Sequence, residues 1–404
     1  MSENAGSLRA RDFRRILLVK LSAVGDVVHT IPVLNALRRR YPAAEIDWLL
    51  KPSIADLVRH HPAVSGILHF DDREWAPPWR ASTLGDVARL VATLRARRYD
   101  LVVDLHGQFR TALLTLATRA PVRIGFDRPR REIWAAGSRD LPAEALRHGW
   151  KGAREASWLA YTHRIRLSTL DMHAVDRYLL VGRMLGFADG PADFGFPIPL
   201  EAVAEVDDLF AAAGLEPGSD EAGRPVVLAP GTLWETKHWH AEGFAELARH
   251  FLARGRPVVL IGSGRDRAVA AKVAANAPGI VDLSGRTTLP GLAALIARSA
   301  VCVTNDSGPM HMAVALRRPV VSVFGPTDPL WIGPYGRPRG VLRADLPCAP
   351  CYFRQLKRCS SGHACMRAIS AEAVIARVEE VLAEAQSARP VPESPIGRHL
   401  APTL

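Results

Sequence analysis

Residues 16–42 read ILLVKLSAVGDVVHTIPVLNALRRRYP, and this stretch predicts the fold of the chain. Residues 16–20 form a short, continuous apolar run, which is typical of a strand buried in a parallel sheet. After a loop, residues 26–40 predict a helix that ends before Tyr41 and Pro42. A buried strand that leads into a helix is half of a βαβ unit, so the segment predicts a parallel α/β sheet.

The same alternation runs to residue 126 and restarts after residue 220. Further strands are predicted at residues 46–50, 67–70, 101–104, 122–126, 226–229, 257–261, 281–283, 300–304 and 320–324. Further helices are predicted at residues 84–98, 105–118, 171–185, 241–254, 267–275, 291–298, 310–316 and 371–385. Residues 127–170 are basic and follow neither pattern. We therefore expect two doubly wound, Rossmann-like α/β domains.

The two domains are expected at residues 14–190 and 221–386, with a Gly- and Pro-rich connector near residues 190–220. Residues 387–404 are expected to form a loose tail, because they are rich in proline. Ligands of such sheets bind beyond the carboxyl ends of the strands. With two domains, this predicts a site in the cleft between them.

The composition fits this organisation. The chain has 404 residues, of which 48% are hydrophobic and 23% charged, as in ordinary globular proteins. It has no run of about 18 apolar residues and no apolar core of a secretory signal near its start, so we expect a cytoplasmic protein without a spanning helix. Five cysteines, an odd number, do not indicate a disulfide scaffold.

The formal net charge of +11 is concentrated locally. Residues 8–20 and 119–139 each have a net charge of +4, and residues 335–367 have +6, so these three stretches total +14 and the remainder −3. A local excess of this kind fits nucleic acid, an anionic membrane or a phosphorylated small molecule. An Arg-rich, solvated surface would explain it equally well.

The loop after the first strand contains Asp26. At the start of a helix, its carboxylate has two interpretations: an N-cap, or a general base that takes a proton from a hydroxyl group. A helix N-terminus makes a carboxylate a weaker base. The pattern of residues alone therefore favours the cap.

Two later turns offer groups for an anion. Residues 228–239 (LAPGTLWETKHW) place Thr232 after a Pro-Gly turn, and Lys237 can supply a point charge to a phosphate. Residues 304–311 (TNDSGPMH) place Asp306, Ser307, Gly308 and His311 between a buried strand and a helix, where free amides face an anion. A packed surface loop and simple helix capping are the alternatives for these two turns.

Four cysteines and one histidine lie close together near the C-terminus: Cys348, Cys351, Cys359, His363 and Cys365. This set can hold a structural zinc ion, although its spacing is not that of a standard zinc finger. Reduced thiols and a disulfide are the alternatives.

Taken together, the motifs resemble family 9 glycosyltransferases, the bacterial lipopolysaccharide heptosyltransferases. The resemblance covers residues 14–386 and rests on six segments: 19–42 (VKLSAVGDVVHTIPVLNALRRRYP), 104–115 (DLHGQFRTALLT), 173–179 (HAVDRYL), 228–239, 283–296 (LSGRTTLPGLAALI) and 304–329 (TNDSGPMHMAVALRRPVVSVFGPTDP). The first segment is most similar to heptosyltransferase I, the subgroup that adds the first heptose to Kdo.

The resemblance implies a GT-B fold, with an acceptor-binding N-terminal domain and a nucleotide-sugar-binding C-terminal domain. It implies inverting transfer of a heptose from ADP-heptose to Kdo-lipid A, with no cofactor and no catalytic metal. Asp26 matches the catalytic base, which reverses the preference for a cap. Matches to donor-binding positions are Thr232, Lys237, Asp306, Ser307, Gly308 and His311.

An anionic glycolipid acceptor also fits the basic patch in the N-terminal domain. We expect its carboxylates and phosphates to be bound by arginines of this patch, namely Arg123, Arg128, Arg130 and Arg131. Such an acceptor implies peripheral association with the cytoplasmic face of the inner membrane.

Three other functions fit parts of the sequence. A family 9 enzyme with another acceptor or sugar, such as heptosyltransferase II, would share the nucleotide and base motifs. A sugar-nucleotide epimerase on the same fold would act without an acceptor. A nucleic-acid-binding protein is suggested by the pI near 9.9 alone, and no RNA- or DNA-binding motif supports it.

Overall fold

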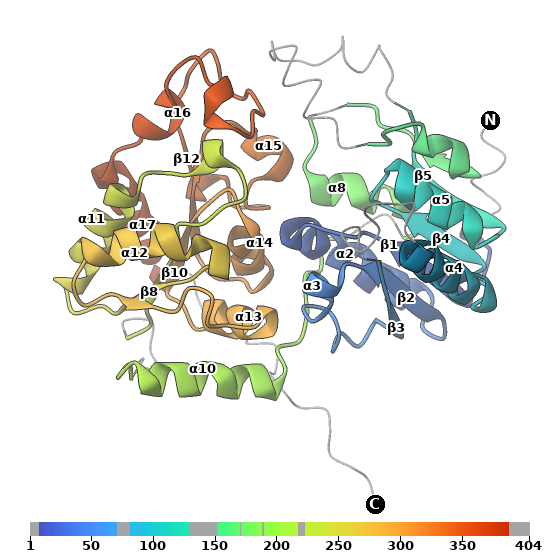
Figure 1. Cartoon of the computed structure of the whole chain (residues 1–404), viewed down its shortest axis with the longest axis horizontal. Coiled ribbons are helices and arrows are strands. Elements are labelled where there is room, and N and C mark those ends of the chain that lie inside the picture. Colours follow the sequence, from blue (N-terminus) through green and yellow to red (C-terminus); the bar gives the residue numbers. More distant parts are fainter. Residues whose placement is uncertain are drawn as a thin grey trace, which may run out of the picture.

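The computed structural model describes residues 8–70, 81–128, 152–169, 171–187, 190–216 and 223–387. Two α/β domains lie side by side (Figure 1), and each contains a six-stranded sheet whose strand pairs are all parallel. The two domains share the same strand order, 3-2-1-4-5-6 by position within each domain. The predicted pair of doubly wound domains, typical of the GT-B fold, is confirmed.

The N-terminal sheet has the order β3-β2-β1-β4-β5-β6. Its strands are β1 (Arg15–Val19), β2 (Glu45–Leu50), β3 (Gly66–His69), β4 (Leu101–Asp104), β5 (Val122–Phe126) and β6 (His163–Ile165). Strand β1 is central, and its four apolar residues are fully buried between the helices on both faces. Strand β6 was not predicted, because it is a three-residue edge strand with the polar sequence HRI.

Helices cover both faces of this sheet (Figure 1). They are α2 (Val24–Arg40), α3 (Pro52–Ala55), α4 (Ala81–Ala96), α5 (Phe109–Ala117), η1 (Ser157–Ala160), α8 (Ala174–Leu179) and α9 (Val181–Leu185). The single helix predicted over residues 171–185 is therefore two helices. The first of them starts at residue 174 because the side chain of His173 caps it by accepting the Val175 N–H.

The C-terminal sheet has the order β12-β11-β10-β7-β8-β9. Its strands are β7 (Val226–Ala229), β8 (Val258–Leu260), β9 (Val281–Asp282), β10 (Val301–Asn305), β11 (Val320–Phe324) and β12 (Val341–Arg343). The other elements are η2 (Glu235–Lys237), α11 (Ala241–Leu252), η3 (Gly264–Asp266), α12 (Arg267–Ala275), α13 (Leu289–Ala297), α14 (Gly308–Ala315), α15 (Pro329–Ile332), η4 (Pro338–Gly340), η5 (Leu356–Arg358), α16 (Ala364–Arg367) and α17 (Ala371–Ser387). Strand β12 is a second edge strand that the sequence pattern did not predict.

The connector between the domains contains a helix that was not predicted, α10 (Leu200–Ala212). It packs against α13, where the Glu205 carboxylate accepts the N–H and the hydroxyl of Thr288. Upstream of it, the Asp193 and Gly195 carbonyls accept hydrogen bonds from the Asn35 amide on α2. The connector is thus fixed to both domains.

One large apolar cluster runs through both domains. It joins β1 and α2 of the N-terminal domain to α13 and α14 of the C-terminal domain, so the domains meet through buried contacts as well as through the connector. None of the described helices is long and apolar enough to cross a membrane. The predicted tail lies outside the described residues, except for Ser387 at the end of α17.

Candidate active site

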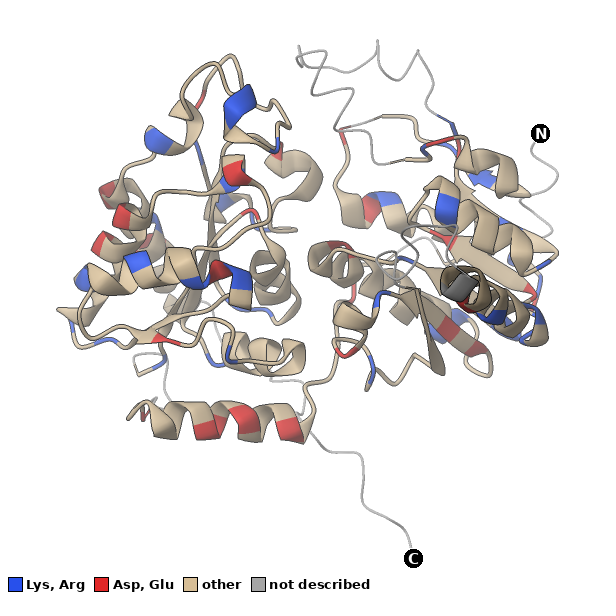
Figure 2. Ribbon diagram, in the orientation of Figure 1, with Lys and Arg blue, Asp and Glu red and all other residues tan. Residues whose placement is uncertain are grey.

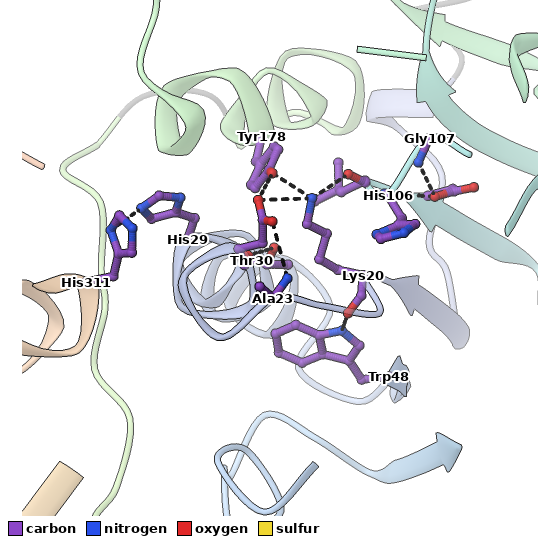
Figure 3. A network of polar contacts seen from close by, with 12 residues as sticks. Lys20, Ala23, His29, Thr30, Trp48, His106, Gly107, Tyr178 and His311 are labelled. Carbon is purple, nitrogen blue, oxygen red and sulfur yellow. Dashed lines mark hydrogen bonds and ion pairs between the residues drawn. The ribbon is translucent and has the colours of Figure 1, made fainter. Parts of the chain in front are cut away.

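The carboxylate of Asp26 lies in a polar network beyond the carboxyl end of β1. Figure 3 shows its labelled partners Lys20, Ala23 and Tyr178. Asp26 Oδ1 accepts a hydrogen bond of 2.9 Å from the Tyr178 hydroxyl and lies 3.4 Å from the Lys20 ammonium. Lys20 also donates to the Tyr178 oxygen at 2.6 Å and to the Leu105 carbonyl at 3.2 Å. The network therefore combines the residue that follows β1 with residues of α2 and α8.

Asp26 is the third residue of α2 and not its cap. Helix α2 begins at Val24, and the cap position belongs to Ala23, whose N–H donates to Asp26 Oδ2 at 3.3 Å. Asp26 is therefore not the N-cap residue that the pattern of residues favoured. The Asp26 side chain is 41% exposed, whereas that of Lys20 is 7% exposed. A substrate can therefore reach the carboxylate, but the ammonium beside it is covered.

The electrostatics of this network favour a negative charge on Asp26. Burial lowers the pKa of Lys20, but Asp26 and Tyr178 outweigh it, so that the pKa is raised and Lys20 is a cation at neutral pH. Burial and the charge of Asp26 raise the pKa of Tyr178, so its hydroxyl stays protonated and donates. Lys20 and the N-terminus of α2 both stabilise the carboxylate.

Helix α2 meets α14 of the C-terminal domain at the domain boundary (Figure 1). A Cβ atom placed on Gly25 would lie 2.3 Å from His311 Cδ2, and one on Gly308 would lie 3.1 Å from Val24. His29 Nε2 and His311 Nδ1 are 2.8 Å apart (Figure 3). The N-terminal turn of α2, which carries Asp26, is therefore in direct contact with α14. We call residues 306–311, which end in the first turn of α14, the donor motif.

Both of these histidines are neutral near pH 7. Burial lowers the pKa of His311 to about 4, although the nearby Asp306 opposes this shift. Burial and His311 hold the pKa of His29 well below its usual value. His311 can thus act as a neutral hydrogen-bond donor but not as a cation.

The C-terminal domain contributes a buried ion pair. Lys237 Nζ lies 2.6 Å from Asp306 Oδ2, and the Thr327 hydroxyl donates to the same oxygen at 2.6 Å. The ammonium also lies 4.3 Å from the centre of the Trp234 ring. The structure thus brings together two donor-site residues that are 69 positions apart in the sequence.

The other predicted donor residues surround this pair. Thr232 donates to the Asp306 carbonyl at 3.3 Å. Ser307 is the N-cap of α14, and its buried Oγ has no hydrogen-bond partner. Gly308 and His311 lie in the first turn of that helix. Free backbone amides, a hydroxyl group and an ammonium group at one helix N-terminus are suited to a phosphate.

The Cys-rich segment, residues 348–365, contacts η2, the turn that carries Lys237. Thr236 is the link between them: its hydroxyl donates to the Phe353 carbonyl at 2.5 Å, and its carbonyl lies 2.7 Å from His363 Nε2. The Arg354 guanidinium lies 5.0 Å from the centre of the Trp234 ring. Basic residues around η5 and α16 are gathered at this end of the domain (Figure 2).

The possible zinc site has no preformed ligand cluster in the described part of the chain. No group of three or more His, Cys, Asp or Glu among the described residues is placed to hold a metal ion. His363 is engaged with the Thr236 carbonyl, Cys365 is buried in the core of the domain, and Cys348 is exposed. The five cysteines are free thiols in the structure.

Of the four predicted acceptor arginines, the structure describes Arg123 and Arg128. The guanidinium of Arg123, on β5, donates to the Ala160 and Ala120 carbonyls. Arg128 is exposed just after the strand. Arg130 and Arg131 lie outside the described residues. Acceptor binding by these arginines stays a prediction.

Several site residues were missed in the sequence. Lys20 and Tyr178 contact Asp26, and Thr327 contacts Asp306. Arg177, beside Tyr178 on α8, is 4% exposed, and its Nε and Nη2 have no partner. A lysine at the end of an apolar strand was a usable signal for Lys20. The contact of α8 with Asp26 could not be predicted, because it depends on how the chain folds back onto α2.

Comparisons with known proteins identify the family. The family model "Glycosyltransferase family 9 (heptosyltransferase)" matches residues 87–148 and 141–360. Lipopolysaccharide heptosyltransferase 1 of Pseudomonas aeruginosa is 33% identical over 340 residues, which are 83% of this chain and 86% of that protein. Lipopolysaccharide heptosyltransferase 2 of Escherichia coli K12 is 27% identical over 342 residues, which are 81% and 88% of the two chains.

A solved structure shares the fold over nearly the whole chain. The E. coli heptosyltransferase WaaC with ADP-2-deoxy-2-fluoro heptose superposes with a TM-score of 0.66 at 26% identity. The match covers 91% of this chain and 99% of that one. The likeness therefore extends over both domains and the boundary between them.

Proposed function

The chain belongs to glycosyltransferase family 9, the heptosyltransferases, and we propose that it transfers a heptose from ADP-heptose to Kdo of the lipopolysaccharide inner core with inversion. The observation that carries the proposal is the contact between the N-terminal turn of α2, which carries Asp26, and α14, which carries the predicted donor-binding residues. Gly25, the residue before Asp26, packs against His311 of the donor motif. This contact supports a base from one domain that acts on a donor bound by the other.

Asp26 is the general base in this proposal. Its exposed carboxylate takes the proton from the acceptor hydroxyl as that oxygen attacks the anomeric carbon. Tyr178 and Lys20 hold Oδ1, and the N–H of Ala23 holds Oδ2, so the carboxylate is oriented before substrate arrives. Attack from the N-terminal domain on a donor held by the C-terminal domain fits inversion of the anomeric centre.

The C-terminal domain stabilises the leaving ADP. Negative charge develops on the diphosphate as the glycosidic bond breaks, and Lys237, the N-terminus of α14 and the His311 N–H are placed to balance it. Asp306 binds the heptose hydroxyls. Because Lys237 and Asp306 already contact each other, the phosphate and the sugar are bound at adjoining points.

The test is a product assay with purified protein, ADP-heptose and Kdo₂-lipid A, read by mass spectrometry. We expect one heptose to be added, and Asp26→Asn to lower kcat by about 10²–10⁴-fold with little change in affinity for ADP. Asp56→Asn is the matched control, because Asp56 is an exposed acid paired with Arg59. Full activity of Asp26→Asn would refute the proposed base.

A second acceptor is favoured by one observation: the E. coli heptosyltransferase 2 is 27% identical, comparable to the 26% of its heptosyltransferase 1. The same assay therefore includes an acceptor that already carries one heptose on Kdo. Transfer to Kdo₂-lipid A alone assigns the chain to the first-heptose reaction. Transfer to the heptosylated acceptor alone assigns it to the second.

An anionic glycolipid acceptor places the reaction at the cytoplasmic face of the inner membrane. The basic stretches of the chain support binding to such a surface. We expect the protein to co-sediment with vesicles that contain Kdo₂-lipid A, and this binding to weaken as the salt concentration rises.

A further inference from the structure

The hydrogen bond between His29 and His311 joins the two halves of the site. His29 comes from the N-terminal domain, three residues after Asp26, and His311 comes from the donor motif of the C-terminal domain. The two ring nitrogens are 2.8 Å apart, and the rings meet edge to face with centres 4.2 Å apart. No other polar side chain contacts His311 Nδ1 among the described residues.

The partners of the two rings fix where their protons lie. His29 Nδ1 is buried and has no hydrogen-bond partner. A buried N–H without an acceptor costs more than a buried lone pair without a donor, so the His29 proton belongs on Nε2. The Nε2–H then donates to His311 Nδ1. Because both rings are neutral, the His311 proton must lie on its own Nε2.

We propose that His29 is a positioning residue which holds His311 in the tautomer with the proton on Nε2, so that His311 donates a hydrogen bond to the diphosphate of the nucleotide sugar. The inference rests on the proposed function for the identity of that anion. Without His29, a neutral His311 is free to carry its proton on Nδ1, and its Nε2 lone pair would then repel the phosphate.

The arrangement also couples the two domains. The bond forms only when α2 lies against α14, which is also the arrangement that brings Asp26 to the donor motif. When α2 packs against α14, His311 therefore takes the tautomer that donates from Nε2, and Asp26 is brought to the donor motif by the same contact. In separated domains neither condition holds, so leaving-group stabilisation and proton removal are assembled together.

The first test reads the tautomer directly by ¹⁵N NMR of histidine-labelled protein, with ADP as the ligand. We expect His311, assigned by loss of its signals in His311→Gln, to carry its proton on Nε2. In His29→Phe, which fills the space but has no N–H, the Nδ1-protonated form should become populated. His29→Gln keeps a donor and should preserve the wild-type tautomer. Protonation of His311 on Nδ1 in the wild type would overturn the proposal.

The second test is kinetic. We expect His29→Phe to lower kcat by roughly 10- to 100-fold and to weaken ADP binding, whereas His29→Gln stays within a few-fold of the wild type. The exposed His60→Gln is the control. Wild-type kcat in His29→Phe would overturn the proposal. Absence of heptose transfer by the wild type refutes the proposed function instead, and the NMR result remains readable because it needs only ADP.

Discussion

At the scale of single residues, the contacts of Asp26 could not be predicted from the sequence. The motif placed Asp26 at a strand-to-helix turn and the family resemblance implied its role, but Tyr178 lies 152 positions away. That contact exists because α8 packs on α2. Local patterns predict which residues end a strand, whereas contacts between distant elements depend on the completed fold.

The Tyr178 hydroxyl orients the Asp26 carboxylate and accepts a bond from Lys20. We expect Tyr178→Phe to lower kcat by about tenfold, because the carboxylate loses its fixed direction, and to cost about 1 kcal/mol of stability. Steady-state kinetics and urea unfolding measure the two effects. Tyr99→Phe is the matched control: its hydroxyl donates to Asp47 at 2.6 Å, in a buried pair outside the site. Equal kcat values in the two variants would contradict this role.

Arg177 is a buried cation whose Nε and Nη2 have no partner, although burial lowers the pKa of its guanidinium. These two nitrogens share the edge that binds a carboxylate with two hydrogen bonds. Burial lowers the pKa of the guanidinium more than its interactions with Tyr178 and Asp26 raise it, so removal of this charge should be stabilising. We therefore expect Arg177→Met to raise the melting temperature of the substrate-free enzyme while it raises KM for the proposed anionic acceptor.

The exposed Arg183→Met, on the neighbouring helix α9, is the control for Arg177→Met. Thermal unfolding and acceptor saturation curves measure the two quantities. A lower melting temperature together with an unchanged acceptor KM would show that Arg177 has an unseen structural partner.

At the scale of elements, the buried strands were predicted well and the edges were not. Strands β4, β5, β7 and β11 match their predicted bounds, because continuous apolar runs are typical of strands covered on both faces. Strands β6 and β12 are short edge strands with arginine in their sequence, so they lack that signal. Helix α10 was missed because its packing partner, α13, lies in another part of the chain.

The close approach of α2 to α14 requires a glycine at position 25. In Gly25→Ala the new Cβ would lie 2.3 Å from His311 Cδ2, so the two helices must move apart. We expect kcat to fall by at least tenfold and stability to decrease, as in other overpacked contacts that cost about 1–3 kcal/mol. Kinetics and chemical unfolding check this.

Gly85→Ala, in the middle of α4, is the control for Gly25→Ala. Nothing lies within 4 Å of its added Cβ, so this change should be neutral or stabilise by up to about 1 kcal/mol. If both variants behaved alike, the effect at position 25 would come from helix propensity and not from contact with α14.

At the scale of the whole molecule, the structure places part of the net charge of +11 beside the candidate site. The basic stretch near residues 335–367 had no assigned role in the sequence. In the structure it includes Arg354, which lies over Trp234, and the segment whose backbone holds the Lys237 turn. This part of the charge therefore borders the proposed binding site of a doubly charged nucleotide.

The contact between the domains should depend on pH. Three histidines lie at this boundary: His29, His173 and His311. Burial lowers the pKa of all three histidines. For His29 and His311 the neighbouring histidines lower it further, and the pKa of His311 is about 4. Unfolded histidine has a pKa near 6.5. Between about pH 4 and 6.5 the unfolded state therefore binds more protons, and stability must fall as the pH falls through this window.

We expect the free energy of unfolding to fall by a few kcal/mol between pH 6.5 and 4.5, beyond the loss that titration of carboxylates causes. In His311→Gln the slope against pH should become shallower, because one proton fewer is taken up on unfolding. His60→Gln is the control and should keep the wild-type slope, because His60 is exposed and lies outside the three-histidine cluster at the domain boundary. Urea unfolding at half-unit steps of pH measures the slopes. Identical slopes in the wild type and His311→Gln would mean that His311 is protonated in the folded state, and the neutral donor assigned to it would be wrong.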